Sequence, residues 1–199
     1  MANMIIRPAT GTGNKVIVQD QAGAAVLTTA DSGATVANAT LTAPTVADMT
    51  NCTFPAGHVL QVVSAAASVE VGHNSTSWAT KAVPAVSLVT KKANSKIYIN
   101  GHSRMHGGNQ TNNLNIDFRR EITGGASTDN ISGEPRGLGA DISYDYEGNF
   151  SCNFLDSPNV ASGTTLTYKF NHRNHSGSVT HYFGHNEMAT VITIMEIAV

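Results

Sequence analysis

The residues best suited to chemistry are histidines that occur in pairs close to predicted turns. The three pairs are His102 with His106, His172 with His175, and His181 with His185. Imidazole binds zinc or iron, and a threefold axis would triple each ligand, so His172 and His175 are candidates for a metal site on such an axis. No carboxylate or cysteine completes a pair locally, which favours exposed polar loop histidines. Contacts with sugars are the third interpretation.

Acidic residues in the segment from 134 to 149 are a second set of possible ligands. The set comprises Glu134, Asp141, Asp145 and Glu147. Two carboxylates that flank a groove would suit a polysaccharide depolymerase, and carboxylates beside Asn149 would suit calcium. A solvated acidic turn explains the same residues, and we prefer this interpretation.

Two segments resemble catalytic motifs, but each lacks a part that its motif requires. The segment Gly101-His102-Ser103-Arg104-Met105 resembles a hydrolase nucleophile elbow, but Met105 occupies the place where that turn needs glycine. The segment Gly11-Thr12-Gly13-Asn14-Lys15-Val16 resembles a phosphate-binding loop without its Gly-Lys-Ser/Thr ending. We therefore expect a protein that is not an enzyme, with no catalytic residues and no cofactor.

Aromatic and polar residues with exposed flat faces are the candidates for ligand binding. They are Trp78, Arg136, Asp141, Tyr144 and Tyr146. Aromatic faces stack on sugar rings and anchor interfaces, and all of these residues except Trp78 fall in a long loop expected from Ile122 to Gly148. Two alternatives remain open: Trp78 packs under a loop, or the long loop packs across to a neighbouring subunit.

The elements that must position these residues are strands, because apolar and polar residues alternate with a period of two. The alternating segments are 15–19, 24–28, 95–100, 113–118, 150–154 and 166–170. Leu114, Ile116 and Phe118 are expected to point inward. The last segment, 190–197, is apolar on both faces and predicts a central strand, or one covered by a neighbouring subunit. Helix signals are nearly absent, so the fold class is all-β, with a jelly-roll-like β-sandwich.

The composition indicates a small core and a neutral surface. Charged residues make up 13% of the chain, aromatic residues 6%, and the net charge is −2. A small core favours oligomerisation, and scattered Lys and Arg argue against nucleic-acid binding. No apolar run is long enough to span a bilayer, and no signal peptide is recognised, so membrane insertion is not expected. Cys52 and Cys152 fit a reducing cytoplasm, as two buried apolar residues rather than a disulfide.

The first 57 residues differ from the rest in having few large side chains. The segments 36–41 and 49–54 form a weak repeat with a spacing of 13. Each copy is too short to close a core alone, so three chains are expected to share one. The chain is thus divided into a particle-docking arm and stalk, 1–57, and a β-sandwich head, 58–199. The stalk residues expected at the shared axis are Val36, Leu41, Met49 and Phe54.

Short motifs along the chain carry a resemblance to a known family. They are Gly13-Asn14-Lys15-Val16, Asp31-Ser32-Gly33, Gly57-His58-Val59-Leu60-Gln61-Val62-Val63, Ser95-Lys96-Ile97, Leu155-Asp156-Ser157-Pro158, Thr165-Leu166-Thr167-Tyr168 and Ile194-Met195-Glu196-Ile197-Ala198. The chain resembles small structural, fibre-like proteins of marine tailed phages, notably cyanophages. The resemblance implies a virion component that is usually trimeric, with a β-sandwich head and no catalytic residues. It leaves the location on tail or capsid open.

Together these observations predict a structural protein of a tailed-phage virion, assembled in the host cytoplasm. The expected form is a homotrimeric fibre- or tip-like component that attaches to the host surface. Its expected partners are further copies of itself, other virion proteins and a host surface glycan. The alternatives are a capsid decoration protein that stabilises the head of the particle and, less favoured, a polysaccharide depolymerase.

Overall fold

The computed structural model describes residues 14–30, 33–36, 55–107, 114–138, 147–175, 180–184 and 187–199. The chain divides into two compact units, Met1–Cys52 and Thr53–Val199, and we call the second unit the head. The described residues form strands and turns and contain no helix, so the all-β prediction is confirmed. Within this part of the chain, accordingly, no helix is long and apolar enough to cross a membrane.

The first unit contains a small antiparallel meander. Its strands are β1 (Ile17–Gln19), β2 (Ala25–Ala30) and β3 (Gly33–Val36), paired in the order β1-β2-β3. The Asp20 carboxylate accepts hydrogen bonds of 2.9 Å from the backbone N–H groups of Ala22 and Ala24, which fixes the turn between β1 and β2. Of the residues expected at a stalk axis, Val36 lies exposed on β3, whereas Leu41, Met49 and Phe54 lie outside the described residues.

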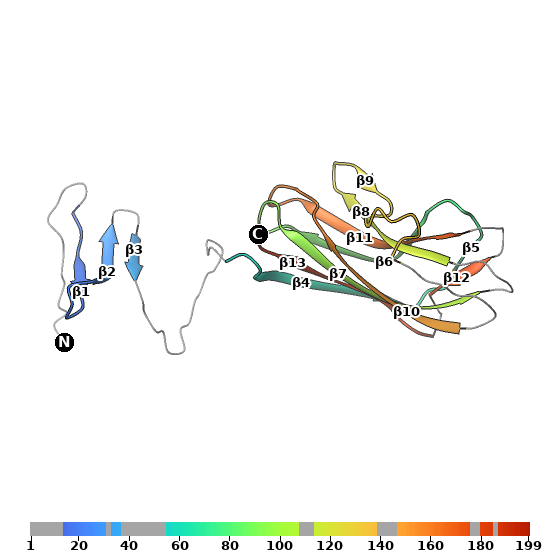
Figure 1. Cartoon of the computed structure of the whole chain (residues 1–199), viewed down its shortest axis with the longest axis horizontal. Coiled ribbons are helices and arrows are strands. Elements are labelled where there is room, and N and C mark those ends of the chain that lie inside the picture. The colour runs from blue at the N-terminus through green and yellow to red at the C-terminus, as the bar shows by residue number, and fades with distance from the viewer. Residues whose placement is uncertain are drawn as a thin grey trace. The chain divides into compact units, whose positions relative to one another are not determined.

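Eight strands of the head build two sheets (Figure 1). They are β4 (Val59–Ala67), β6 (Ala79–Val89), β7 (Lys96–Gly107), β8 (Leu114–Ile122), β9 (Ser127–Thr128), β10 (Glu147–Asp156), β11 (Thr165–Asn174) and β13 (Thr190–Ile197). They pair antiparallel from the outside inward along the chain: β4 with β13, β6 with β11, β7 with β10, and β8 with β9. Folding this nested hairpin gives sheets of order β4-β13-β7-β10 and β6-β11-β8-β9. This is a jelly roll, as the sequence predicts.

Two short strands extend the first sheet at one end of the head. β12 (His181–Phe183) pairs with the last residues of β7, and β5 (Val71–His73) pairs with β12. The opposite end holds both ends of the head's chain, because Gly57 N–H donates to Ala198 O and Ala198 N–H donates to His58 O, each at 2.8 Å. A strand with the 12 residues of β7 spans about 40 Å. We call the end with β5 and β12 the distal end.

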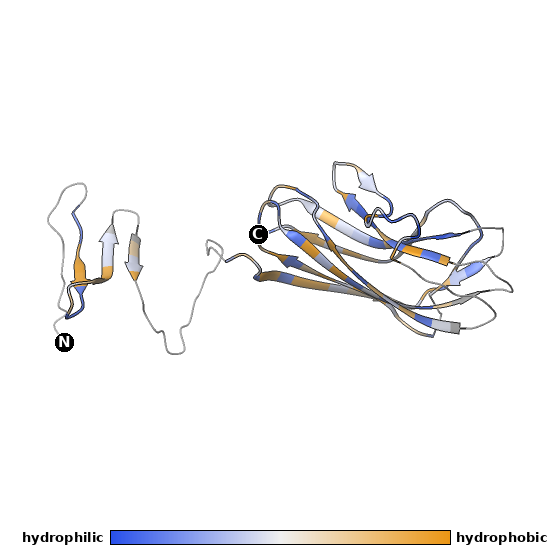
Figure 2. Ribbon diagram, in the orientation of Figure 1, coloured by the Kyte–Doolittle hydropathy of each residue, from blue (hydrophilic) through white to orange (hydrophobic). Residues whose placement is uncertain are grey.

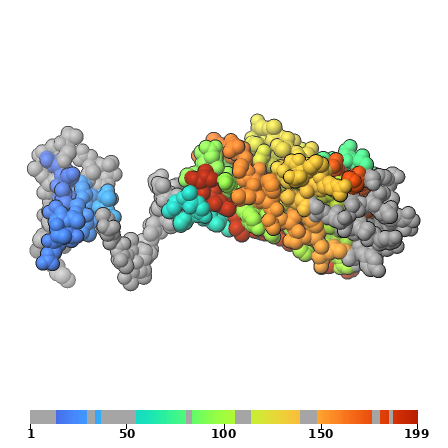
Figure 3. Space-filling model, in the orientation of Figure 1, coloured from blue at the N-terminus to red at the C-terminus, as the bar shows by residue number. Residues whose placement is uncertain are grey.

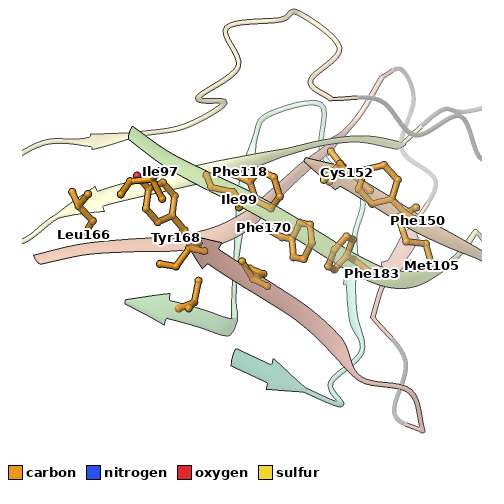
Figure 4. Packing of buried hydrophobic residues seen from close by; sticks show 14 of the residues in the cluster. Ile97, Ile99, Met105, Phe118, Phe150, Cys152, Leu166, Tyr168, Phe170 and Phe183 are labelled. Atoms are coloured by element: carbon orange, nitrogen blue, oxygen red, sulfur yellow. The ribbon is translucent and has the colours of Figure 1, made fainter. Parts of the chain in front are cut away.

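The core lies between the two sheets and follows the alternation in the sequence (Figure 4). Ile97 and Ile99 from β7 meet Phe118 from β8 and Phe170 from β11, all with no exposed surface. The rings of Phe118 and Phe170 stack with 5.1 Å between their centroids. The inward prediction for Leu114, Ile116 and Phe118 is confirmed. Cys152 is free and buried in the same core, whereas Cys52 lies outside the described residues.

Glycine at position 101 makes room for this core. A Cβ atom added at Gly101 would lie within 3.0 Å of the rings of Phe170 and Phe118. The segment from Gly101 to Met105 runs through the middle of β7 without a turn, so it is a strand with a small residue under an aromatic pair. This agrees with the rejection of a nucleophile elbow.

Buried carboxylates fasten loops to the sandwich. Glu196 has no exposed surface and accepts hydrogen bonds from the backbone N–H of Lys91 at 2.8 Å, the hydroxyl of Ser95 at 2.8 Å and the amide of Gln61 at 2.6 Å. These bonds hold the turn between β6 and β7 against the last strand. Asp156 joins the two sheets, because it binds Arg120 at 2.7 Å and accepts the hydroxyl of Tyr168 at 2.7 Å.

The long loop expected from Ile122 to Gly148 has internal structure where it is described, and this corrects the prediction. It includes β9, and its turn at 130–134 is fastened to the buried Asp117 carboxylate by the hydroxyl of Ser132. The backbone N–H of Ile131 donates to Phe118 O at 3.1 Å, and that of Leu138 donates to Ile116 O at 2.8 Å. Strand-like hydrogen bonds to β8 thus hold this part of the segment.

Candidate binding surface at the distal end of the head

The distal end gathers aromatic, basic and histidine side chains from strands that are far apart in the sequence. β5 and the connection from β5 to β6 meet the ends of β11 and β12 there. The backbone N–H of Asn174, at the end of β11, donates to Ser75 O at 2.9 Å and fixes this connection. In Figure 1 the labels of β5 and β12 mark this end of the head.

Trp78 is half-buried and lies beside Arg173 of β11. The guanidinium carbon of Arg173 stands 4.9 Å from the centre of the Trp78 ring, within the range of a cation–π contact. Arg173 also donates a hydrogen bond to the carbonyl oxygen of Pro135. The arginine therefore connects the tryptophan on one side with the turn after β9 on the other.

Gly137 allows this turn to approach the tryptophan closely. Its φ of +68° lies in the left-handed region, and an added Cβ atom would stand 3.0 Å from Cη2 of Trp78. The same Cβ atom would collide with the carbonyl oxygen of Ile116. Trp78 thus has Arg173 over its ring and the 134–138 turn at its edge, which favours the interpretation that it packs against a loop.

A cluster of histidines lies next to this site. The rings of His73 and His172 meet edge to face with 4.7 Å between centroids, and His172 stacks on Phe183 at 5.8 Å. His181 is the cross-strand neighbour of His73 in the pairing of β12 with β5. Because His73 comes from β5 and was not part of any pair in the sequence, only the fold could reveal this cluster.

The expectation of exposed loop histidines is wrong for His172 and His181. His172 is 1% exposed and His181 is 3% exposed, and both lie on strands. A ligand on an axis between chains must reach the surface, and His172 does not, whereas His175 is exposed. Among the described residues no group of three or more His, Cys, Asp or Glu side chains is arranged to hold a metal ion.

The electrostatics of the histidine cluster favour neutral imidazole. Burial lowers the pKa of His181 from its usual value, because the charged form loses hydration. Its Nε2 atom is buried without a hydrogen-bond partner among the described residues. The cluster is therefore a polar extension of the aromatic core formed by Phe170 and Phe183, whose ring centroids lie 4.8 Å apart.

The remaining predicted ligand-binding residues are placed only in part. Arg136 lies exposed in the turn between Glu134 and Gly137, next to the Trp78 and Arg173 pair. Asp141, Tyr144 and Tyr146 lie outside the described residues. The fold thus brings Trp78 and the Arg136 turn together although they are 58 positions apart. Arg173 completes the group, and sequence reasoning missed it because the flanking histidines drew attention away from it.

A second polar surface, on the outer face of the β6-β11-β8-β9 sheet, is an ion-pair network. Arg119 binds Glu121 at 3.0 Å and Asp129 at 2.7 Å, and Lys169 binds Glu121 at 2.8 Å. The hydrogen bond from Lys169 is the main cause that lowers the pKa of Glu121. Because these charges are paired with one another, the network explains its own residues without a ligand. Residues of β8, β9 and β11 cover this side of the head in Figure 3.

Comparisons with known proteins supply solved structures of low similarity. No model of a known protein family matches the chain, and no curated protein matches it in sequence. Two structures of infectious bursal disease virus, of the Gt and Gx strains, share 10% identity with it over 72% of this chain, each with a TM-score of 0.41. The chain spans 38% and 39% of those chains. The CBM22-1 xylan-binding domain of Paenibacillus barcinonensis Xyn10C shares 10% identity over 74% of this chain and 99% of that domain, with a TM-score of 0.30.

Proposed function

We propose that the chain is a structural, non-enzymatic component of a tailed-phage particle that attaches the particle to its host. The observation that carries this proposal is the placement of the head's two chain ends. Residues 57–58 are hydrogen-bonded to Ala198, so the head is tethered at one end and presents the end with Trp78 and Arg173 away from its tether. Connecting loops on a rigid β-sandwich commonly carry recognition.

The chemistry of the distal end suits a neutral or weakly acidic glycan. Arg136 is exposed there, and the turn that carries it is held in place by Gly137 and Arg173. A fixed turn with donor groups loses little conformational entropy on binding. Copies of the head in a homotrimer, repeated on one particle, would add avidity to weak individual contacts.

The test of this proposal is competition for adsorption to host cells. Purified chain is expected to reduce the adsorption of particles in a concentration-dependent way, because it occupies the same receptor. The matched variant replaces Arg136 by Ala, which removes an exposed donor without touching the core, and it is expected to compete several-fold less well. Full competition by the Arg136→Ala variant, or none by the unaltered chain, contradicts an attachment role for this end.

A capsid decoration protein is the second candidate, and one observation favours it. Exposed apolar residues such as Val62 and Leu155 lie on the side of the head rather than at its distal end. A decoration protein uses such a side to join neighbouring subunits. Removal of the protein from particles would then lower the temperature at which they release their genome and leave adsorption unchanged. An attachment protein gives the opposite pair of results.

A further inference from the structure

The outer face of the β4-β13-β7-β10 sheet carries rows of residues that the strand register places side by side. Its first row is Val62, Met195, Tyr98 and Leu155, one residue from each of four neighbouring strands. Alternation puts these residues on the face opposite the core, because their neighbours Ile97 and Ile194 are fully buried. Val62 is 55% exposed and Leu155 is 45% exposed, so an apolar row crosses the whole width of the sheet. Figure 2 shows hydrophobic colour along much of β4.

The rows that follow are polar but uncharged. The second row contains Ser64, Thr193, Asn100 and Asn153, and the third contains Ala66, Val191, His102 and Ser151. The hydroxyls of Ser64 and Thr193 hydrogen-bond each other at 3.0 Å, so part of the polarity is satisfied within the sheet. We call these three rows, from Val62 to Ser151, the uncharged face. On β7 it is bounded by Lys96 and Arg104.

The opposite sheet shows that this lack of charge is specific to one side. There Arg119, Glu121, Lys169 and Asp129 form paired ions on the outer face. A sheet face turned to water normally carries such charges, which also protect it from unwanted association. Four adjacent strands without an Asp, Glu, Lys or Arg in three rows therefore have the composition of an interface, in which charged residues are depleted.

We propose that the uncharged face is covered by a second copy of this chain. The argument for this occupant is charge matching. A face that offers no charge gains nothing from an acidic glycan, a nucleic acid or a charged protein surface. The same face of another copy is equally uncharged, so self-association brings no like charges together and desolvates no ion.

The size of the face sets the expected strength of the association. Strands spaced about 4.8 Å apart, with about seven residues of about 3.3 Å along each, give a footprint of about 400 Å². This matches the apolar patches of about 300 to 600 Å² that mark interaction sites, but it is smaller than the roughly 800 Å² per partner of a standard interface. We therefore expect self-association at micromolar rather than nanomolar concentration. The inference goes beyond the proposed attachment role and does not depend on it.

The test is sedimentation equilibrium of the full chain at about 1 to 100 µM, a range chosen around the affinity expected for a small interface. The unaltered chain is expected to sediment as a multiple of its 20.8 kDa. Val62→Lys and Leu155→Lys each place a charge in the apolar row and are expected to weaken association at least about tenfold. The control is Val89→Lys, since Val89 is 49% exposed on an edge strand of the other sheet, and it is expected to leave association unchanged.

Each possible result supports or overturns the inference. Loss of association in both variants of the uncharged face, with the control intact and circular dichroism unchanged, supports it. A monomeric unaltered chain at 100 µM, an unchanged association constant in the face variants, or an equal loss in the Val89→Lys control overturns it. An unchanged constant would mean that other parts of the chain hold the copies together, and the attachment role would remain to be judged by adsorption.

Discussion

Single residues decide how closely the two sheets of the head approach. Glycine 101 lies beneath the stacked rings of Phe118 and Phe170, where no side chain fits. The sequence alone offered this glycine as part of a catalytic motif, because the neighbouring Ser103 and His102 suggested chemistry. The motif and the packing use the same residue types, and only the position of β8 and β11 distinguishes them.

Replacement of Gly101 by Ala tests this packing. The added methyl group must displace the Phe170 ring, so we expect a loss of about 1 to 3 kcal/mol in the free energy of unfolding. Urea denaturation followed by circular dichroism measures it. The control is Gly148→Ala on the paired strand β10, where an added Cβ atom meets nothing within 4 Å. An equal loss in both variants would mean that strand flexibility, and not the aromatic pair, sets the cost.

The contact between Arg173 and Trp78 can be followed by fluorescence, because Trp78 is the single tryptophan of the chain. Arg173→Ala removes the guanidinium from the ring and admits water, so we expect a red shift of the emission maximum. Stability is expected to fall by about 0.5 to 1 kcal/mol, the value of an exposed cation–π contact. Arg136→Ala serves as the control and should leave the emission unchanged. Emission that stays constant in Arg173→Ala would show that the arginine does not cover the ring.

The buried His181 makes the stability of the head depend on pH. Burial lowers its pKa in the folded state relative to the unfolded state, so protonation favours unfolding. The stabilising contribution is present above the unfolded pKa, near 6.5, and is lost as the pH falls through the folded pKa. We expect the free energy of unfolding to decrease between pH 7 and pH 5, and His181→Gln to reduce this decrease. A variant with the same pH dependence as the unaltered chain would assign the effect to other groups.

Among the elements, the strands with clean alternation were predicted and the irregular ones were not. β7, β8, β10, β11 and β13 coincide with alternating segments, and β13 lies between β4 and β7 as a central strand. β6 was missed because Pro84 interrupts its pattern. The pairing of β6 with β11 shifts register between Lys169 and Asn171, and β6 lies at the end of its sheet, where proline is tolerated. β5 and β12 have three residues each, too few for a periodic signal.

The turn between β6 and β7 depends on one carboxylate of the last strand. Glu196→Gln replaces an acceptor of several N–H and hydroxyl groups by an amide that can accept fewer of them. We expect a loss of about 1 to 3 kcal/mol in the free energy of unfolding, the cost of buried donors without partners. Thermal unfolding measures it, with the exposed Glu134→Gln as the control. A loss of less than about 0.5 kcal/mol, within the usual range of surface substitutions, would contradict the role given to Glu196.

At the scale of the whole molecule, the division into two units agrees with the change of composition near residue 57. The sequence could not predict which residues meet at the distal end, because Trp78, Arg173 and the 134–138 turn are joined only by the jelly-roll connections. It also predicted a homotrimer from a small core, and the uncharged face offers a physical location for part of that contact. Host, receptor and stoichiometry belong to the assembled particle.

The stalk prediction is tested by assembly. Leu41→Asp and Phe54→Asp each place a charge at the expected shared axis, where an unpaired charge is costly. We expect both variants to lower the sedimenting mass from trimer to monomer while the circular dichroism of the head stays unchanged. A trimer that survives both substitutions would contradict a stalk formed by residues 34–57.

The central claim is that this chain belongs to the particle and faces the host, and labelling of intact particles tests it most directly. Gold-labelled antibodies raised against the head are applied to purified particles and viewed by electron microscopy. The account predicts label at the outer tips of tail structures, at several copies per particle. Label spread evenly over the capsid would support the decoration protein instead. Absence of label from intact and from gently opened particles, with strong label in infected-cell lysate, would contradict a virion role.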